Sequence, residues 1–191
     1  TRKGKGYFKM EIQQAIAIRR SIRAYGDRPV EREKLEAVLR AGNQAPIFGR
    51  LHMSVFAGPE QLQAVDAAAV AGMARSGVPF LENLAAQEGY HPLYGAAALV
   101  VLSAPGGLDE KGFNMANVSC AAENMLLAAA GLGLGSCFLM GPMAAFSDPA
   151  LRARLELPGG YEPLVGVALG YAAPEHPAAP ERTDAGTTWC R

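Results

Sequence analysis

The chain has little of what several protein classes require. Its 191 residues include three cysteines, none in a CxxC pair, and three isolated histidines, so no zinc-binding spacing occurs. Lysine plus arginine equals aspartate plus glutamate at 18 each, so no excess of positive charge predicts nucleic acid or an anionic membrane as a partner. No run of 18 apolar residues occurs, so we expect no membrane span. Cysteines that cannot all pair favour the reducing cytoplasm.

Length and composition indicate one domain. Half of the residues are apolar, which is enough for one well-filled core and too little for two. The basic stretch 1–9 lacks the apolar segment and cleavage site of a signal peptide, so we expect an upstream extension with little role in the fold. Residues 10–173 form the expected domain. Prolines from Pro174 onward predict an extended arm over 174–191.

Hydrophobic periodicity predicts alternating helices and strands. Helical spacing covers 11–20, 31–41, 60–75 and 114–132, and strands are expected at 52–57, 97–102, 136–140 and 164–169. Between them, 76–95 is rich in glycine and proline and predicts an excursion with one short helix. The order is that of a mixed α/β or α+β fold. The run 97–102 is apolar throughout, which predicts a central strand covered on both faces.

The helix expected over 114–132 has small or apolar residues nearly all round. A helix without a polar face is buried, so it is either a central helix or a helical dimer interface. Glu123 within it needs a partner, and a structural hydrogen bond to a helix end or an arginine is favoured over catalysis. Gly131, Gly133 and Gly135 follow this helix and precede a strand. Since the dinucleotide fingerprint has the opposite order and a different spacing, these glycines are predicted to end the helix and allow a tight turn.

The cluster Arg19-Arg20-Ser21-Ile22-Arg23 is the first candidate binding site. Guanidinium groups offer planar paired donors and a serine hydroxyl adds a short bond, which suits a phosphate. A solvated basic helix end is the alternative, because the helix dipole favours cations there. Composition alone favours this second interpretation. Cys137 is predicted to be an inert buried thiol. No Ser–His–Asp or paired-carboxylate spacing occurs, which fits a cofactor that brings its own chemistry.

Four stretches of the sequence are weak signals singly and fairly specific in their order. They are AIAIRRSIRAYGDRPVEREKLEAVLRAG, Ala45-Pro46 after the second helix, Tyr94-Gly95-Ala96-Ala97 before the apolar strand, and CAAENMLLAAAGLGLGSCF. Together, over about 11–182, they resemble the nitroreductase family of FMN-dependent flavoproteins. The resemblance implies an α+β fold with a central, mostly antiparallel sheet flanked by helices. It also implies a homodimer whose C-terminal arm is exchanged between subunits.

The resemblance also implies a flavin site at the subunit boundary. Positions that hold the phosphate and the polar edge of FMN fall on Arg19, Arg20, Ser21 and Arg23. The strand-end backbone beside the ring, with an N–H at flavin N5, falls on Leu139, Met140 and Gly141. The loop that reaches the flavin from the partner subunit falls on Pro46, Ile47, Phe48 and Gly49. The basic residue of the arm that returns to the phosphate falls on Arg182. The flavin carries the chemistry, so no catalytic side chain and no metal are expected.

The sequence departs from the family pattern after Ala45-Pro46. The family usually has small polar residues followed by Gln-Pro-Trp, whereas this chain has Ile47-Phe48-Gly49-Arg50-Leu51-His52-Met53. Arg50 either stabilises reduced flavin near N1 and O2, receives an acidic substrate, or is an ordinary surface charge. Arg50, Phe48 and Tyr94 are the candidate substrate-binding residues, with Tyr90 a further aromatic. The departure points to an acceptor other than the common ones of the family.

The resemblance implies an activity in two half-reactions. NADH or NADPH delivers hydride to the flavin, and a small electron-poor acceptor such as a nitroaromatic or a quinone then takes the electrons. Two alternatives stay open. One is a flavin-binding carrier or sensor without NAD(P)H turnover. The other is the same fold catalysing reductive dehalogenation or flavin cleavage.

Overall fold

The computed structural model describes residues 10–106, 112–175, 183 and 185–190. The strands in these ranges form one four-stranded sheet in the order β1 (His52–Phe56), β2 (Ala98–Pro105), β4 (Tyr161–Gly170), β3 (Gly135–Leu139). Each neighbouring pair is antiparallel, and β3 lies at an edge. The predicted α+β fold with a central antiparallel sheet is therefore confirmed.

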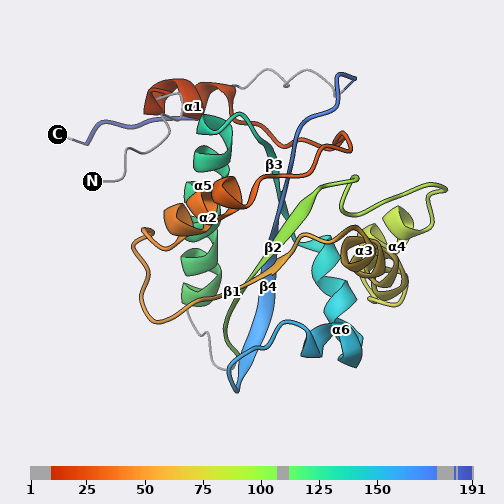
Figure 1. Cartoon of the computed structure of the whole chain (residues 1–191). Helices are drawn as coiled ribbons and strands as arrows, with labels where there is room; N and C mark the ends of the chain where they lie inside the picture. Colours follow the sequence, from red (N-terminus) through yellow and green to blue (C-terminus); the bar gives the residue numbers. More distant parts are fainter. Residues whose placement is uncertain (1–9, 107–111, 176–182, 184, 191) are drawn as a thin grey trace.

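Helices cover both faces of the sheet (Figure 1). On one side lie α2 (Arg32–Gly42) and α5 (Phe113–Gly131), with α1 (Ile12–Ile18) packed on α5. On the other side lie α3 (Pro59–Met73), the 3-10 helix η1 (Gly141–Ser147) and α6 (Pro149–Ala153), with α4 (Pro79–Ala85) beside α3. Periodicity had predicted α1, α2, α3 and α5, and the short helix expected within 76–95 is α4.

Strand β2 is buried from Ala98 to Ala104, as the uniformly apolar run predicted. Val100 and Leu102 belong to the core beneath α2 and α5, whereas Leu99 and Val101 belong to the core beneath α3 and η1. Successive side chains of a strand point to opposite faces, so a strand between two helical layers must be apolar at every position.

Helix α5 is less enclosed than its composition suggested. Its inner face is buried against the sheet and α2, with Val118, Ala122 and Met125 inaccessible. Its outer face carries exposed residues at helical spacing, namely Phe113, Ala116, Cys120 and Glu123. Within one chain, the outer face of α5 is therefore exposed although three of these four residues are small or apolar. We call these four residues the α5 stripe.

Helix α1 ends at Ile18, two residues earlier than expected, because Arg19 has an extended backbone. Ala15 is buried against the rest of the chain, but Ile12, Ile16 and Ile18 are exposed. The apolar face that periodicity identified on this helix is thus only partly covered within one chain.

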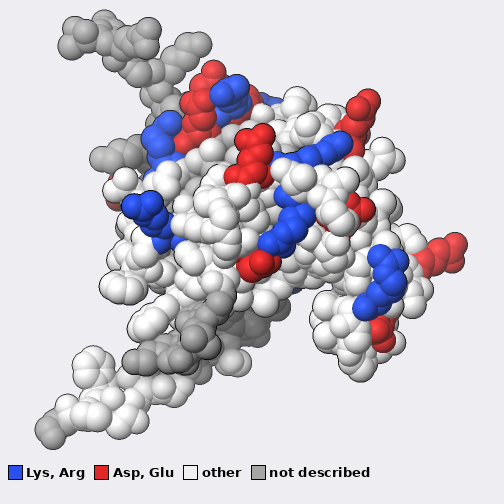
Figure 2. All heavy atoms as spheres, turned by 90° about the horizontal axis from the view of Figure 1, so that it is seen from below, with Lys and Arg blue, Asp and Glu red and all other residues white. Residues whose placement is uncertain are grey.

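Charges of both signs are interspersed on the face shown in Figure 2, in line with the net charge of zero. Within the described ranges, no helix combines the length and apolarity needed to cross a membrane. The same residues contain no group of three His, Cys, Asp or Glu side chains that could hold a metal ion.

Candidate functional site

The segment that follows α1 is bound to the sheet by its backbone. The N–H of Ile22 donates to the carbonyl of Ser136 over 2.9 Å, and the N–H of Gly26 donates to the carbonyl of Tyr171 over 2.9 Å. Ala173 in turn donates to Ala24 over 3.0 Å. The segment therefore runs from the start of β3 to the continuation of β4. This brings the basic cluster of the sequence onto the edge of the sheet.

The glycine turn after α5 makes this approach possible. The N–H of Leu134 donates to Ala129 and Gly133 has a φ of 72°, the left-handed backbone that ends many helices. At Gly135, a Cβ would lie 2.9 Å from Cγ1 of Ile22, which leaves no room for a side chain. The structural interpretation of the glycines is confirmed, because they end α5 and admit the segment after α1 to β3.

The arginines of the cluster lie at two different hollows. Arg19 and Arg20 line a hollow of about 490 Å³ between the end of α1 and the glycine turn, together with Ser136. Arg23 instead lines a larger cavity beyond Ile22, whose own side chain is buried. The cluster is therefore divided between two hollows, one on each side of Ile22, and does not form one solvated helix end.

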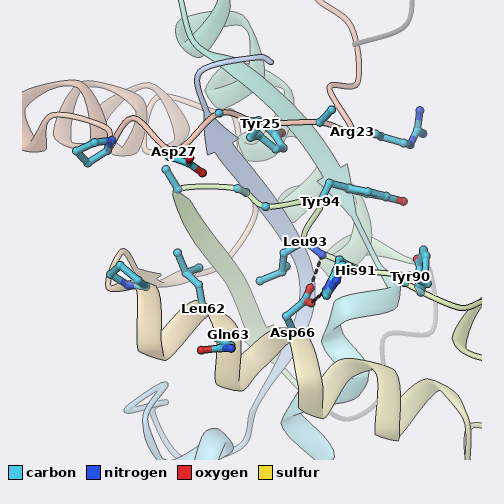
Figure 3. A pocket seen from close by; sticks show the side chains of 18 of the residues that line it. Arg23, Tyr25, Asp27, Leu62, Gln63, Asp66, Tyr90, His91, Leu93 and Tyr94 are labelled. Carbon is cyan, nitrogen blue, oxygen red and sulfur yellow. Dashed lines mark hydrogen bonds and ion pairs between the residues drawn. The ribbon is translucent and has the colours of Figure 1, made fainter. Parts of the chain in front are cut away.

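The larger cavity has a volume of about 980 Å³ (Figure 3). It lies between residues 23–29, the first turns of α3 and residues 87–97. On its α3 side, the carboxylate of Asp66 accepts from Nδ1 of His91 over 2.7 Å and from the N–H of Leu93 over 2.8 Å. Asp66 thereby fixes the turn that precedes β2.

Three tyrosines line this cavity near Arg23. The hydroxyl of Tyr25 is buried and has no hydrogen-bond partner among the described residues, and burial raises the pKa of Tyr25. Burial, followed by a hydrogen bond with Tyr94, raises the pKa of Tyr90 to about 12. The rings of Tyr90 and Tyr94 meet edge to face with centroids 6.3 Å apart. The raised pKa values keep the phenols of Tyr25 and Tyr90 neutral near pH 7, and the Tyr25 hydroxyl is an unsatisfied donor.

Cys137 lies beneath the basic segment on β3. Burial raises the pKa of the Cys137 thiol, and the guanidinium of Arg23 and a hydrogen bond with Ser21 offset part of this rise. The predicted buried thiol is confirmed. Ser21 and Arg23, which lie far from Cys137 in sequence, are the neighbours that spacing could not reveal.

The other end of β3 carries the second group of candidate residues. Leu139 is buried, Met140 is exposed, and Gly141 begins η1. Since a strand rises roughly 3.4 Å per residue, Met140 lies about 14 Å along β3 from Ser136, where the basic segment is bound. The edge of β3 between these points faces away from β4.

The loop of Pro46, Ile47, Phe48 and Gly49 lies apart from the basic segment. Phe48 is held by Asn117 in the first turns of α5, whereas the basic segment lies beyond Ala130 at the end of that helix. Thirteen residues of helix correspond to roughly 20 Å, although the side chain of Arg19 reaches back to Glu123, about 9 Å along the helix from Asn117. Arg50 is exposed and lines neither hollow, so among the candidate substrate residues only Tyr94 lies beside Arg23. Arg182 lies outside the described residues.

Three features of the site were not predicted from the sequence. These are the hydrogen bonds between Asn117 and the Phe48 backbone, the Asp66–His91 pair and the unsatisfied hydroxyl of Tyr25. Asn117 and Asp66 did carry a signal, since each is a polar side chain on a largely apolar helix. Their partners lie on loops 25 or more residues away, which no periodicity connects to the helix.

Glu123 confirms one prediction and corrects another. Its carboxylate pairs with an arginine, as expected, through Nε of Arg19 at 3.0 Å. It is half-exposed on the outer face of α5 and not enclosed by the core, because this helix turns only one face to the sheet.

Comparisons with known proteins agree with this architecture. The model of the nitroreductase family matches residues 16–171. A curated protein of Archaeoglobus fulgidus, provisionally named NADH dehydrogenase/NAD(P)H nitroreductase, is 32% identical over 170 residues, which is 86% of this chain and 87% of that protein.

Solved structures give the same result. A nitroreductase with bound FMN from Bacteroides fragilis is 30% identical, with a TM-score of 0.81 over 95% of this chain and 98% of that one. A nitroreductase with bound FMN from Desulfitobacterium hafniense shares the fold at 24% identity, with a TM-score of 0.77 over 90% of this chain and 95% of that one. With the family model covering most of its length and a curated relative above 30% identity, this chain belongs to the nitroreductase family.

Proposed function

We propose that this protein is an FMN-dependent oxidoreductase that moves electrons from NADH or NADPH to a small electron-poor acceptor, such as a nitroaromatic or a quinone. The observation that carries the proposal is the placement of Arg19 and Arg20 in one hollow at the start of β3 and of Arg23 in a second cavity further along the same segment. Two relatives support it. The Bacteroides fragilis protein has bound FMN, and the name of the Archaeoglobus fulgidus protein includes NAD(P)H.

The residues present fit the two ends of FMN. Its phosphate requires cationic donors, and Arg19 and Arg20 line the smaller hollow together. Its flavin ring has a polar edge of carbonyl and imide groups, and Arg23 lines the larger cavity together with Tyr25. A cavity of about 980 Å³ is within the range of cofactor sites. Leu139, Met140 and Gly141 would border the ring from the far end of β3.

The protein's own contribution is to bind and orient the cofactor. FMN, when bound, supplies the hydride and electron transfer chemistry. The guanidinium of Arg23 would compensate negative charge at the polar edge of the ring. Tyr90 and Tyr94 would line that end of the site as hydrogen-bonding and stacking surfaces.

The site as proposed is completed by a second copy of the chain. Phe48 and Arg50 are exposed and line neither hollow of their own chain, so they are placed to serve the site of a partner. The α5 stripe and the exposed isoleucines of α1 are the proposed contact surface. We further propose that the arm over 174–191 is exchanged between the two subunits and brings Arg182 to the phosphate. We also propose that the protein acts in the cytoplasm.

Spectroscopy of the purified protein tests the function. We expect FMN to bind with a defined stoichiometry and its absorbance to bleach anaerobically when NADH or NADPH is added, then return with a quinone or nitroaromatic. Bound FMN that neither nicotinamide reduces would indicate a carrier or another electron donor. Failure to bind added FMN would refute the proposal altogether. A screen of acceptors against photoreduced protein, with wild type and Arg50→Ala in parallel, identifies the acceptor class.

A further inference from the structure

The side chains of Arg19 and Glu123 form an ion pair between α1 and α5. The Nε atom of Arg19, which directly follows α1, lies 3.0 Å from Oε1 of Glu123. The side chain of Arg19 is only 18% exposed, whereas that of Glu123 is 50% exposed. An enclosed guanidinium thus meets a carboxylate that remains in contact with solvent.

The contact between Arg19 and Glu123 is at one edge of the guanidinium. Arginine has five N–H donors in a planar fork, and the recorded contact with Glu123 engages Nε. Phosphate groups bind arginine through two parallel donors, and the contact with Glu123 is at Nε and not at the terminal nitrogens. The same Arg19 lines the smaller hollow with Arg20, so its guanidinium lies between the carboxylate on α5 and a space suited to an anion.

We infer that Glu123 is a positioning residue for phosphate recognition: it holds the guanidinium of Arg19 by Nε so that the terminal nitrogens face the hollow between α1 and the glycine turn. This inference rests on the proposed binding of FMN and adds a residue that does not itself touch the phosphate. It predicts that the site prefers FMN over riboflavin, because riboflavin lacks the phosphate that Arg19 would bind.

Glu123 could instead compete with the phosphate for Arg19, and the geometry decides against this. A competing carboxylate would occupy the terminal nitrogens, whereas Glu123 meets Nε. Because the guanidinium of Arg19 lies between Glu123 and the hollow, its positive charge offsets the repulsion between this carboxylate and a phosphate. Removing Glu123 would free the long side chain of Arg19, which must then lose rotamer freedom when it binds a phosphate. We expect this entropic cost to exceed the gain from removing the repulsion between Glu123 and the phosphate.

The test compares FMN with riboflavin. We expect Glu123→Ala to weaken FMN binding about 10-fold, the lower end of what loss of an outer-shell partner costs at metal sites, and to leave riboflavin affinity unchanged. Glu123→Gln keeps an oxygen that can accept from Nε, so it should retain most of the FMN affinity. Glu36→Ala is the matched control, since Glu36 pairs with Arg32 and Arg40 on the exposed face of α2.

A double-mutant cycle separates this inference from the proposed function. In an Arg19→Ala background, Glu123→Ala should have no further effect on FMN affinity. If wild type binds riboflavin as tightly as FMN, or Arg19→Ala leaves FMN affinity intact, the phosphate assignment itself fails. If Arg19→Ala weakens FMN binding but Glu123→Ala leaves it unchanged, or tightens it, Glu123 does not position Arg19 and the inference is wrong.

Discussion

The side-chain amide of Asn117 hydrogen-bonds both backbone polar groups of Phe48. The N–H of Phe48 donates to Oδ1 of Asn117 over 3.0 Å, and Nδ2 of Asn117 donates to the Phe48 carbonyl over 2.5 Å. Asn117 is 6% exposed, yet the Phe48 side chain is 82% exposed, with its ring centroid 6.1 Å from that of Phe113. The loop is therefore fixed by its backbone while its aromatic ring is left available to another molecule.

Asn117→Ala should lower the free energy of unfolding by about 1–3 kcal/mol, because two hydrogen bonds are lost and a buried space is left. Urea denaturation measures this change. Asn124→Ala is the matched control on the same helix, since Asn124 makes a single bond of 3.2 Å to the Ala41 carbonyl and should cost less. Equal costs for the two variants would show that Asn117 does not fix the loop.

Gly135→Ala should destabilise the protein and weaken FMN binding. The new Cβ would lie 2.9 Å from Cγ1 of buried Ile22, so the segment carrying Arg19 and Arg23 must move away from β3. Overpacking of this kind costs about 1–3 kcal/mol. Thermal unfolding and FMN titration measure the two effects.

Gly131→Ala is the control for Gly135→Ala in the same turn. A Cβ at Gly131 meets nothing within 4 Å, and this glycine is the last residue of α5. It should be neutral or gain up to about 1 kcal/mol from helix propensity. Similar losses in both variants would mean that the turn tolerates no side chain, whatever its distance from Ile22.

Acid stability should depend on Tyr171. Its hydroxyl donates to Glu31 over 2.7 Å, and this bond is the main reason that the pKa of Glu31 is lowered from 4.5 to about 2. A carboxyl whose folded pKa is lowered adds stability above its unfolded pKa, and this stability is lost as pH falls through the folded value. The relevant window is therefore from about pH 4.5 down to about pH 2.

Tyr171→Phe should make the fall of melting temperature across this window shallower than in wild type, because the folded pKa of Glu31 then moves toward its unfolded value. Thermal unfolding at half-unit pH steps measures the slope. Tyr161→Phe, at the opposite end of β4, should keep the wild-type slope. An unchanged slope in Tyr171→Phe would contradict the assigned cause.

The oligomeric state should respond to the exposed face of α1. Ile16→Glu should shift the protein from a dimer toward its 20.1 kDa monomer, because a charge in the proposed interface would be desolvated without a partner. Sedimentation velocity measures the distribution. Val78→Glu is the control, since Val78 is 46% exposed and Ile16 48%, but Val78 precedes α4 on the other side of the sheet. A dimer that survives Ile16→Glu would place the interface elsewhere.

Much of the fold was predictable because it depends on local pattern. The apolar run 97–102 required a strand buried on both faces, and β2 is such a strand. Helices α1, α2, α3 and α5 followed from 3.6-residue spacing, and α2 ends at Gly42. The order of strands was not predictable, because pairing joins segments such as β2 and β4 that lie more than 50 residues apart.

The basic cluster shows where local pattern stops being informative. Spacing identified Arg19, Arg20 and Arg23 as one group, but the backbone bonds of Ile22 to β3 divide them between two hollows. Likewise, the bare composition of α5 suggested full burial, whereas only its packing on the sheet shows which residues form the exposed α5 stripe. Exposure on a helix depends on the neighbours that cover it, and these come from distant parts of the chain.

By itself, the sequence determined the class of fold, the family and the positions that carry its motifs, because these follow from the order of residues along one chain. Only the tertiary structure decided which side chains meet. Arg19 pairs with Glu123, the Phe48 backbone hydrogen-bonds the side chain of Asn117, and Arg23 lines the same cavity as Tyr25 and Tyr94. Each of these contacts joins elements distant in sequence, and its geometry is fixed by the packing of helices on the sheet.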